Sequence, residues 1–565
     1  MKKTIFTFLI LCLMFLVVGC ANNTTTTKKA TTTVDGGGND TSSVTTTKSQ
    51  YATWAEAKAN RVEITIYVDE SNVYGPYVKG VDENVVEEAI EKKFWEDTGL
   101  AIKLNILYES HSTFSNTFGA VMAASSWDAC VSYLGQAGIE ETILNQDVTL
   151  DITSLLRQYG SHIVESLGED SLNAVTSYND TIIGIPSQNI TKQKAVLIRK
   201  DYMTQVGYTE SKEEAETSNG TLIWCRTITD FDTMVRKMKA EIPACTTPLS
   251  GSVYDMEFTL LAGCMDSTGY QYRSINYNAD GSIKEVVPGW ISENYGKVLA
   301  QEYDWVTDGI WETDNMTISA NARLSNFAAG KSAVYFADPT ITNLIDVARR
   351  CKEIDPTAEF TILDPLDAVD ENGNAIENSG AFVEVSKNTD CILFNKRSKR
   401  VPLLIQYIDW MYSSKENYEL CAYGIKGEHW IESEYGDDYY EYADEYFVTH
   451  KPYSGVFALL HNDELSYRIP MQYTETERAW IQKARSYRCF SNPTDGMLFY
   501  GASSQITTNF TTAEADIYLY CATLAWAGTK DPRTTWTSSC DKYREQASDY
   551  IEWLTNQYKL YRASR

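Results

Sequence analysis

The stretch RVEITIYVDE, residues 61–70, is the part of the sequence that most clearly indicates a fold. Its apolar and polar side chains alternate as far as Val68, which is the period of a β-strand with one face in a core. Asp69 and Glu70 follow at the carboxyl end of this predicted strand. If the strand belongs to a parallel sheet, both acidic residues lie at the edge where ligands usually bind.

Outward from this strand, the sequence alternates between helical and strand patterns. Asn84 and Glu87 have the spacing of a capping box, and Gly99 is suited to end the helix that they begin. The next predicted elements are a strand, a helix and a strand, over residues 100–108, 114–124 and 127–133. This order predicts an α/β fold with a mostly parallel sheet.

Polar residues follow the third predicted strand as they follow the first. Tyr133 and Gln136 come at its carboxyl end, so they are expected at the same sheet edge as Asp69 and Glu70. These four residues are candidates for ligand binding. A role in solvating loops is an equally good interpretation of each one taken alone.

A second α/β region is predicted after residue 190. Strands over 181–186 and 194–199 are joined by a linker that contains Ser187 and Asn189. Tyr254 begins a predicted helix, and Asp338 follows a predicted strand over 332–336. The two regions together exceed the size of an ordinary single domain, so more than one domain is expected.

The N-terminus has the pattern of a bacterial lipoprotein signal. Met1-Lys2-Lys3 precedes an apolar run that is too short to span a membrane, and the run ends at Gly19-Cys20. This pattern predicts cleavage before Cys20 and a lipid on its thiol. The Thr/Ser/Gly-rich residues after it lack the apolar side chains needed for a core and predict a loose tether.

The composition argues against several classes of function. A net charge of −28 disfavours nucleic-acid binding, which needs clustered cations. The histidines lack metal-ligand spacing, no C-x-x-C pair occurs, and the calcium-like run Asp370–Asn374 lacks the required Gly and Glu. No metal and no cofactor is therefore predicted. The cysteines that remain after Cys20 could form disulfides or be buried thiols.

Four stretches in order resemble the family 1 extracellular solute-binding proteins, the lipoprotein receptors of ABC importers. The fourth is the most specific and resembles the Y-G-x-x-G-x-x-[YW] pattern of the glycan-importing branch. The stretches are Ile185-Pro186 with Leu197–Tyr208, Phe327–Val334, Tyr407–Tyr412, and Tyr423–Trp430. The resemblance covers roughly residues 60–435, and the acidic calcium-like insert found in that branch before E-I-P is missing here.

This resemblance implies a type II periplasmic-binding-protein fold, with two α/β lobes around a cleft. Beyond the signal peptide (1–19) and tether (20–59), lobe one is expected at 60–189 plus 380–450 and lobe two at 190–379 plus 451–565. Hinges are expected near Asn189–Ala195 and Gly380. Strand-end geometry and the family's usual placements point to these ligand-binding residues: Asp69, Glu70, Tyr133, Gln136, Ser187, Asn189, Tyr254 and Asp338.

The function implied by the resemblance is capture of a carbohydrate, with an oligosaccharide as the favoured kind, for the permease subunits of an ABC importer. The protein would be a monomer, anchored through Cys20 to the outer face of the cytoplasmic membrane, without catalytic activity. Three alternatives stay open. They are binding of a peptide or another small solute, a surface-anchored enzyme acting on polysaccharide with two carboxylates across a cleft, and an adhesive surface protein.

Overall fold

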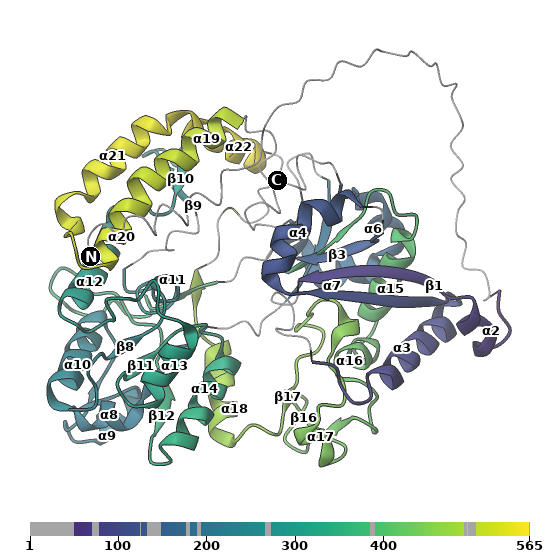
Figure 1. The fold of residues 1–565 in the computed structure, drawn as a ribbon, viewed down its shortest axis with the longest axis horizontal. Helices are drawn as coiled ribbons and strands as arrows, with labels where there is room; N and C mark the ends of the chain where they lie inside the picture. Colours follow the sequence, from purple (N-terminus) through teal and green to yellow (C-terminus); the bar gives the residue numbers. More distant parts are fainter. Residues whose placement is uncertain are drawn as a thin grey trace. The chain divides into compact units, whose positions relative to one another are not determined.

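The computed structural model describes most of the chain after the predicted tether. The described residues are 50–69, 78–124, 126–132, 148–173, 175–176, 181–188, 194–265, 273–384, 390–490, 494 and 504–563. Their elements form two α/β regions, each built on its own sheet, with additional small sheets and a helical C-terminal region (Figure 1).

The first region is built on a five-stranded sheet with the order β2-β1-β3-β14-β4. β1 pairs in parallel with β2 and β3, whereas β14 runs antiparallel to β3 and β4. Four of the five strands therefore run in one direction and β14 runs against them, which confirms the predicted mostly parallel sheet. The strands are β1 (Val62–Asp69), β2 (Ile102–Glu109), β3 (Ala129–Ser132), β4 (Gly184–Pro186) and β14 (Cys391–Phe394).

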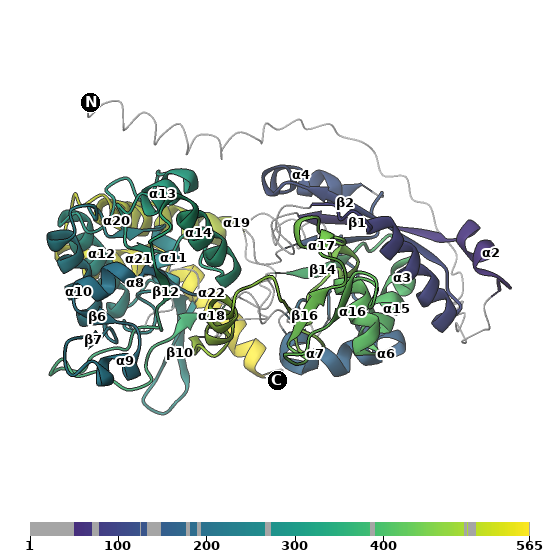
Figure 2. The ribbon, with the colours of Figure 1, turned by 90° about the horizontal axis from the view of Figure 1, so that it is seen from below.

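Helices cover both faces of the first sheet. Alternate residues of β1 explain this: Ile64 and Ile66 enter one apolar core, whereas Tyr67 enters another beside α4. Figure 2 shows α4 on one side of the strands and α3, α15 and α16 on the other. The helices are α3 (Glu83–Thr98), α4 (His111–Ala123), α6 (Thr153–Tyr159), α7 (Ser161–Asn173), α15 (Val401–Tyr412) and α16 (Lys415–Tyr423); α2 (Trp54–Ala59) precedes β1.

The start of α3 differs from the sequence-based expectation. The helix begins at Glu83, and Asp82 occupies the N-cap position without a side-chain capping bond. The predicted capping box at Asn84 and Glu87 is therefore wrong. The carboxylate of Glu83 instead accepts hydrogen bonds from the backbone N–H groups of Gly80 (3.0 Å) and Ser454 (2.9 Å), so a distant segment fixes this end of the helix.

The second region is built on a four-stranded sheet with the order β12-β5-β11-β8. β11 is parallel to β8 and antiparallel to β5. The strands are β5 (Leu197–Arg199), β8 (Leu249–Ser250), β11 (Val334–Tyr335) and β12 (Phe360–Ile362). Around them lie α8 (Lys200–Gln205), α9 (Lys212–Thr217), α10 (Ile228–Glu241), α11 (Val253–Phe258), α12 (Glu293–Thr307), α13 (Ala320–Ala328) and α14 (Ile341–Ile354).

Strand pairs are β6 (Tyr208–Thr209) with β7 (Ile223–Trp224), β9 (Arg273–Tyr277) with β10 (Ile283–Pro288), and β13 (Phe382–Val383) with β18 (Cys489–Phe490).

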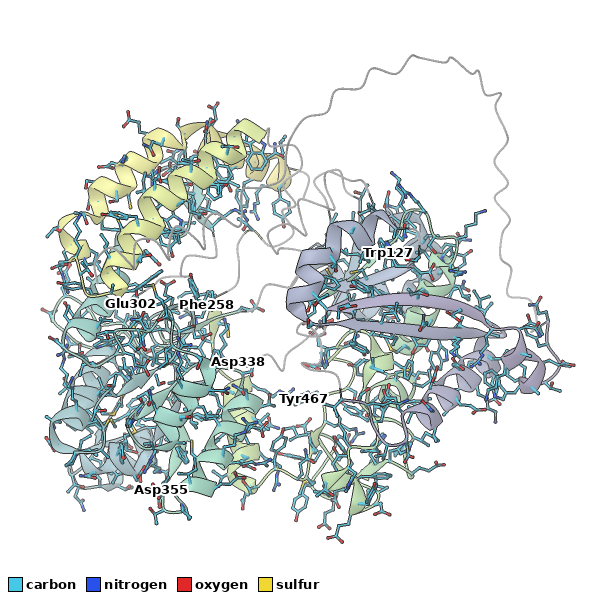
Figure 3. The ribbon with its side chains drawn as sticks, viewed as in Figure 1. Trp127, Phe258, Glu302, Asp338, Asp355 and Tyr467 are labelled. Carbon is cyan, nitrogen blue, oxygen red and sulfur yellow. The ribbon has the colours of Figure 1, made fainter. Side chains whose placement is uncertain are left out.

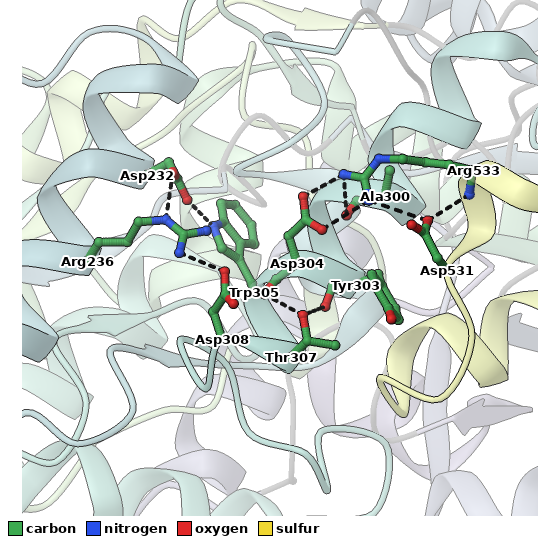
Figure 4. Close-up of polar contacts among 10 residues, drawn as sticks. All are labelled: Asp232, Arg236, Ala300, Tyr303, Asp304, Trp305, Thr307, Asp308, Asp531 and Arg533. Carbon is green, nitrogen blue, oxygen red and sulfur yellow. Dashed lines mark hydrogen bonds and ion pairs between the residues drawn. The ribbon is translucent and has the colours of Figure 1, made fainter.

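The C-terminal helices pack against the second region through aromatic rings and ion pairs. Trp290 stacks on Tyr518 at 4.7 Å between ring centroids and meets Tyr543 edge-on at 4.5 Å. Arg533 pairs with Asp304 of α12, as Figure 4 shows. The elements are α19 (Ser504–Ala513), a π-helical turn (Glu514–Leu519), α20 (Tyr520–Trp526), α21 (Trp536–Gln546) and α22 (Ser548–Ala563).

A tyrosine-rich small sheet follows α16. It has the order β15-β16-β17, with β15 (Trp430–Glu432), β16 (Tyr439–Tyr442) and β17 (Ile469–Pro470), and it is accompanied by α17 (Tyr446–Thr449) and followed by α18 (Glu475–Arg485). Tyr453–Leu460 pack in the core of the first region, whereas Ile469 packs with α14 and α18 of the second. The lobe boundaries stay a prediction.

Ten cysteines lie in the part of the chain that the structure describes, from Cys130 to Cys540. None of these ten is in a disulfide, and seven of them are buried. Cys421 is fully buried in the core of the first region. Cys521 is only partly buried, on α20.

Candidate ligand-binding site

The carboxyl ends of parallel strands mark one edge of each main sheet. In the first sheet these ends are Asp69 of β1, Ser132 of β3 and, after β4, Ser187. In the second sheet they are Ser250 of β8 and Tyr335 of β11, and Tyr254 and Asp338 follow them. Ligands of open α/β sheets bind beyond such ends, so these two edges are the candidate site.

Two predicted residues at the edge of the first sheet are described, and both are buried. Asp69 is the last residue of β1 and has no exposed surface. The Ser187 hydroxyl donates to the carbonyl oxygen of His461 (3.1 Å) and accepts from the N–H of the same residue (3.0 Å). Ser187 therefore ties β4 to a distant segment. The predicted residues Glu70, Tyr133, Gln136 and Asn189, and the lipidation residue Cys20, lie outside the described residues.

The edge of the second sheet brings Tyr254 close to Asp338 through Asp255. Ser252 caps α11, since its hydroxyl accepts from the backbone N–H of Asp255 (3.1 Å) and donates to the Asp255 carboxylate. The same carboxylate accepts from the backbone N–H of Asp338 at 3.4 Å. Tyr254, at the first turn of α11, is 38% exposed, and its ring meets that of Trp526 edge-on at 6.1 Å.

Asp338 has an unusual backbone conformation. Its φ of 48° lies in the left-handed region, where Asp and Asn are the non-glycine residues most often found. The carbonyl oxygen of Asp338 accepts from the Asn343 side chain (2.8 Å), and the carbonyl of Pro339 accepts from the N–H of Ala195 (2.8 Å). This turn is therefore held against the chain that enters the second region, and the Asp338 side chain stays exposed.

Lys194 places a cation beside these carboxylates. Its ammonium group donates to the carbonyl oxygen of Val383 (2.9 Å) and lies 4.1 Å from the ring centroid of Phe258. Burial lowers the pKa of Lys194 to about 8, although the charge of Asp255 opposes that change. Burial also raises the pKa of Asp255. Figure 3 marks Phe258 and Asp338.

This edge can recognise a polar ring compound. An exposed tyrosine ring offers a face for stacking, and carboxylates with a nearby ammonium accept and donate hydrogen bonds. Sequence reasoning missed Lys194, Asp255 and Phe258. The Ser252-x-x-Asp255 capping pattern was the available signal for Asp255, whereas the other two come together only through folding.

The described residues contain no group of His, Cys, Asp and Glu side chains that could hold a metal ion. Over the same residues, no helix is long and apolar enough to cross a membrane.

Comparison with solved structures shows which fold this is. The chain resembles the N-glycan transport solute-binding protein NgtS of Streptococcus pneumoniae, at 13% identity and a TM-score of 0.61, over 89% of this chain and 99% of that one. It resembles an HMO-binding, ABC-transporter-associated solute-binding protein of Bifidobacterium longum infantis at 14% identity and a TM-score of 0.58, over 89% and 99% of the two chains.

A third similar structure is FusA of Streptococcus pneumoniae in complex with kestose, at 13% identity and a TM-score of 0.54, over 90% of this chain and 100% of that one. No protein-family model and no curated protein sequence matches the chain. The structural matches span nearly the whole length of each protein and agree with the two sheets and their helices. The chain therefore has the two-lobed α/β fold of the solute-binding proteins of ABC transporters.

Proposed function

We propose that this protein captures an oligosaccharide in the cleft between its two lobes and delivers it to the permease of an ABC importer. The observation that carries the proposal is the whole-chain likeness to sugar-binding receptors of this fold. NgtS, for example, has been solved with Man1GlcNAc (TM-score 0.55 to this chain) and with Man5GlcNAc (0.51). The alginate-binding protein AlgQ2 also matches, at a TM-score of 0.55.

The second-sheet edge has the chemistry that sugars require. Tyr254 supplies an exposed ring for the C–H face of a sugar, and Asp338 supplies an exposed carboxylate for hydroxyl groups. Lys194 and Asp255 complete a polar surround. The first lobe would add the other predicted residues, from Asp69 to Asn189. A ligand that touches both lobes stabilises the closed form by its greater affinity for that form.

The receptor role carries further expectations. The protein acts as a monomeric lipoprotein, held by a lipid on Cys20 at the outer face of the cytoplasmic membrane, and the tether gives the lobes reach toward the permease. It performs no catalysis and needs no cofactor. Ligand leaves it chemically unchanged.

Thermal unfolding of the purified chain against oligosaccharides and short peptides tests the proposal. At a hundred times its dissociation constant, a ligand stabilises the folded protein by about 2.7 kcal/mol. We expect stabilisation by an oligosaccharide that is recovered intact, and a loss of stabilisation in Tyr254→Ala. The matched control is Tyr277→Ala, which removes an exposed tyrosine from β9. Stabilisation by peptides alone, or hydrolysis of the sugar, would contradict the proposal.

A further inference from the structure

A pocket lies beside α16 and the small sheet, and none of the residues that line it belongs to the edge at Tyr254 and Asp338. It has a volume of about 230 Å³, and its walls come from α16, β16 and the chain between residues 451 and 468. Six tyrosines line it: Tyr418, Tyr423, Tyr440, Tyr442, Tyr453 and Tyr467. We call it the tyrosine pocket. Figure 3 marks Tyr467.

Hydrogen bonds hold several of these rings in place. The Tyr453 hydroxyl donates to the carbonyl oxygen of Cys421 (2.6 Å), and the Tyr423 hydroxyl donates to that of Ser466 (3.3 Å). The Tyr418 hydroxyl accepts from the backbone N–H of Asn462 at 2.6 Å. Because the rings are fixed before any ligand arrives, little side-chain entropy is lost when one binds.

Charged groups stand among the rings. Asp463 and Arg468 line the pocket, although they are only 7% and 5% exposed, and Arg468 pairs with Glu419 at 2.6 Å. Lys451 is exposed at the same wall. Carboxylate and cation beside aromatic faces are the groups that bind hydroxyls while a ring stacks.

The pocket is attached to the predicted first crossing between the lobes. His461 accepts at its carbonyl oxygen from the N–H of Gln188 (2.7 Å) and from the Ser187 hydroxyl. The N–H of Asp463 in turn donates to the carbonyl oxygen of Gln188 at 2.8 Å. Two wall residues are therefore bonded directly to the chain that leaves β4.

The walls also join two separate cores. Tyr418 and Tyr453 belong to the core of the first region. Tyr467 packs against the cluster formed by α14 and α18, and the guanidinium of Arg485 on α18 lies 4.1 Å from its ring centroid. A ligand in the tyrosine pocket would therefore contact side chains anchored in both regions.

We propose that the tyrosine pocket is a sugar subsite that binds one ring of the oligosaccharide, separately from the edge at Tyr254 and Asp338. The volume fits one ring, because pockets for drug-sized ligands usually measure about 300–1,000 Å³. The proposal rests on the proposed function, since it assigns part of the same ligand. Its own content is a site for a single sugar, lined by side chains of both regions and of the small sheet.

Isothermal titration of the purified full chain with single sugars tests this subsite. The probes are the methyl pyranosides of mannose, glucose and galactose, and N-acetylglucosamine. Tyr442→Ala removes a partly buried wall ring, and Ala422→Phe fills the pocket from α16 without removing any polar group. Tyr435→Ala is the matched control, because Tyr435 is 60% exposed on the same segment and does not line the pocket.

We expect at least one single sugar to bind the wild-type chain and Tyr435→Ala. Both pocket variants should weaken that binding by about tenfold or more. Failure of every single sugar to bind, or unchanged binding in Ala422→Phe, would overturn the subsite. Titration with oligosaccharides separates the subsite from the receptor function. If oligosaccharides bind and no single sugar does, the subsite is overturned and the receptor function stands. If single sugars bind and no oligosaccharide does, the receptor function is overturned.

Discussion

The carboxyl group of Glu302 is buried behind the candidate site. It lies on α12 with no exposed surface, and one of its oxygens accepts from the indole N–H of Trp526 at 2.8 Å. The other oxygen is buried and finds no hydrogen-bond partner among the described residues. Nearby, Glu257 is also buried and accepts from the Tyr295 hydroxyl at 2.6 Å. Burial, and then the charge of Glu257, raise the pKa of Glu302 well above its ordinary 4.5.

This raised pKa makes stability depend on pH with a definite sign. In the unfolded chain Glu302 ionises near pH 4.5, whereas in the folded protein it keeps its proton to higher pH. Between these values the unfolded state binds fewer protons, so the free energy of unfolding falls as pH rises. The slope reaches at most about 1.4 kcal/mol per pH unit, where the unfolded chain has lost this proton and the folded protein still holds it. Below pH 4.5 this contribution is fully present.

Glu302→Gln removes the titrating proton and keeps a side chain of nearly the same shape. We therefore expect the free energy of unfolding of the variant to rise relative to that of the wild type from pH 5 to pH 7, by at most about 1.4 kcal/mol per pH unit. Burial also raises the pKa of Glu91 and of Glu312 to about 7. These two groups titrate in both the variant and the wild type, so they do not contribute to the difference between the two free energies of unfolding. The assay is urea unfolding followed by tryptophan fluorescence at pH 5, 6 and 7. Glu434→Gln, at an exposed residue, is the control. If the free energy of unfolding has the same dependence on pH in Glu302→Gln as in the wild type, the pKa of Glu302 is not raised in the folded protein.

Three more predictions concern the core, the site and the anchor. Phe94→Ala should cost about 3–5 kcal/mol in chemical unfolding, because its fully buried ring packs edge-on against Tyr407 and Trp410; a cost like that of an exposed residue would contradict the core assignment. Asp338→Gly should leave the unfolding free energy within about 1 kcal/mol of wild type, since glycine tolerates the positive φ, while oligosaccharide affinity falls roughly tenfold. Unchanged affinity in calorimetry would remove Asp338 from the site. Cys20→Ala should move the protein from the membrane fraction to the soluble fraction of cells, and retention at the membrane would contradict lipidation of that thiol.

Local patterns predicted most of the elements of both sheets. The alternation at Ile64, Ile66 and Val68 placed β1, and the apolar face after Pro402 placed α15. β14 was missed, although it is the strand inserted between β3 and β4. It is a short run of four buried residues, which a periodicity argument cannot distinguish from a buried helix segment, and its partners lie far earlier in the chain.

The candidate site was only partly predictable for a related reason. The rule that ligands bind beyond the carboxyl ends of strands predicted Tyr254 and Asp338, because it needs only the order of strands and helices along the chain. Lys194 is held at the site by a hydrogen bond to the carbonyl oxygen of Val383. Trp526 contacts the ring of Tyr254 because the C-terminal helices pack against the second region. Such contacts depend on tertiary packing between distant segments. No local spacing in the sequence encodes them.

We propose that oligosaccharide binding closes the two lobes around the ligand. Small-angle X-ray scattering of the purified chain, with and without an oligosaccharide that stabilises it, tests this claim most directly. We expect a smaller radius of gyration with that sugar and no change with a sugar that does not bind. Saturating binding with an unchanged radius of gyration would contradict it.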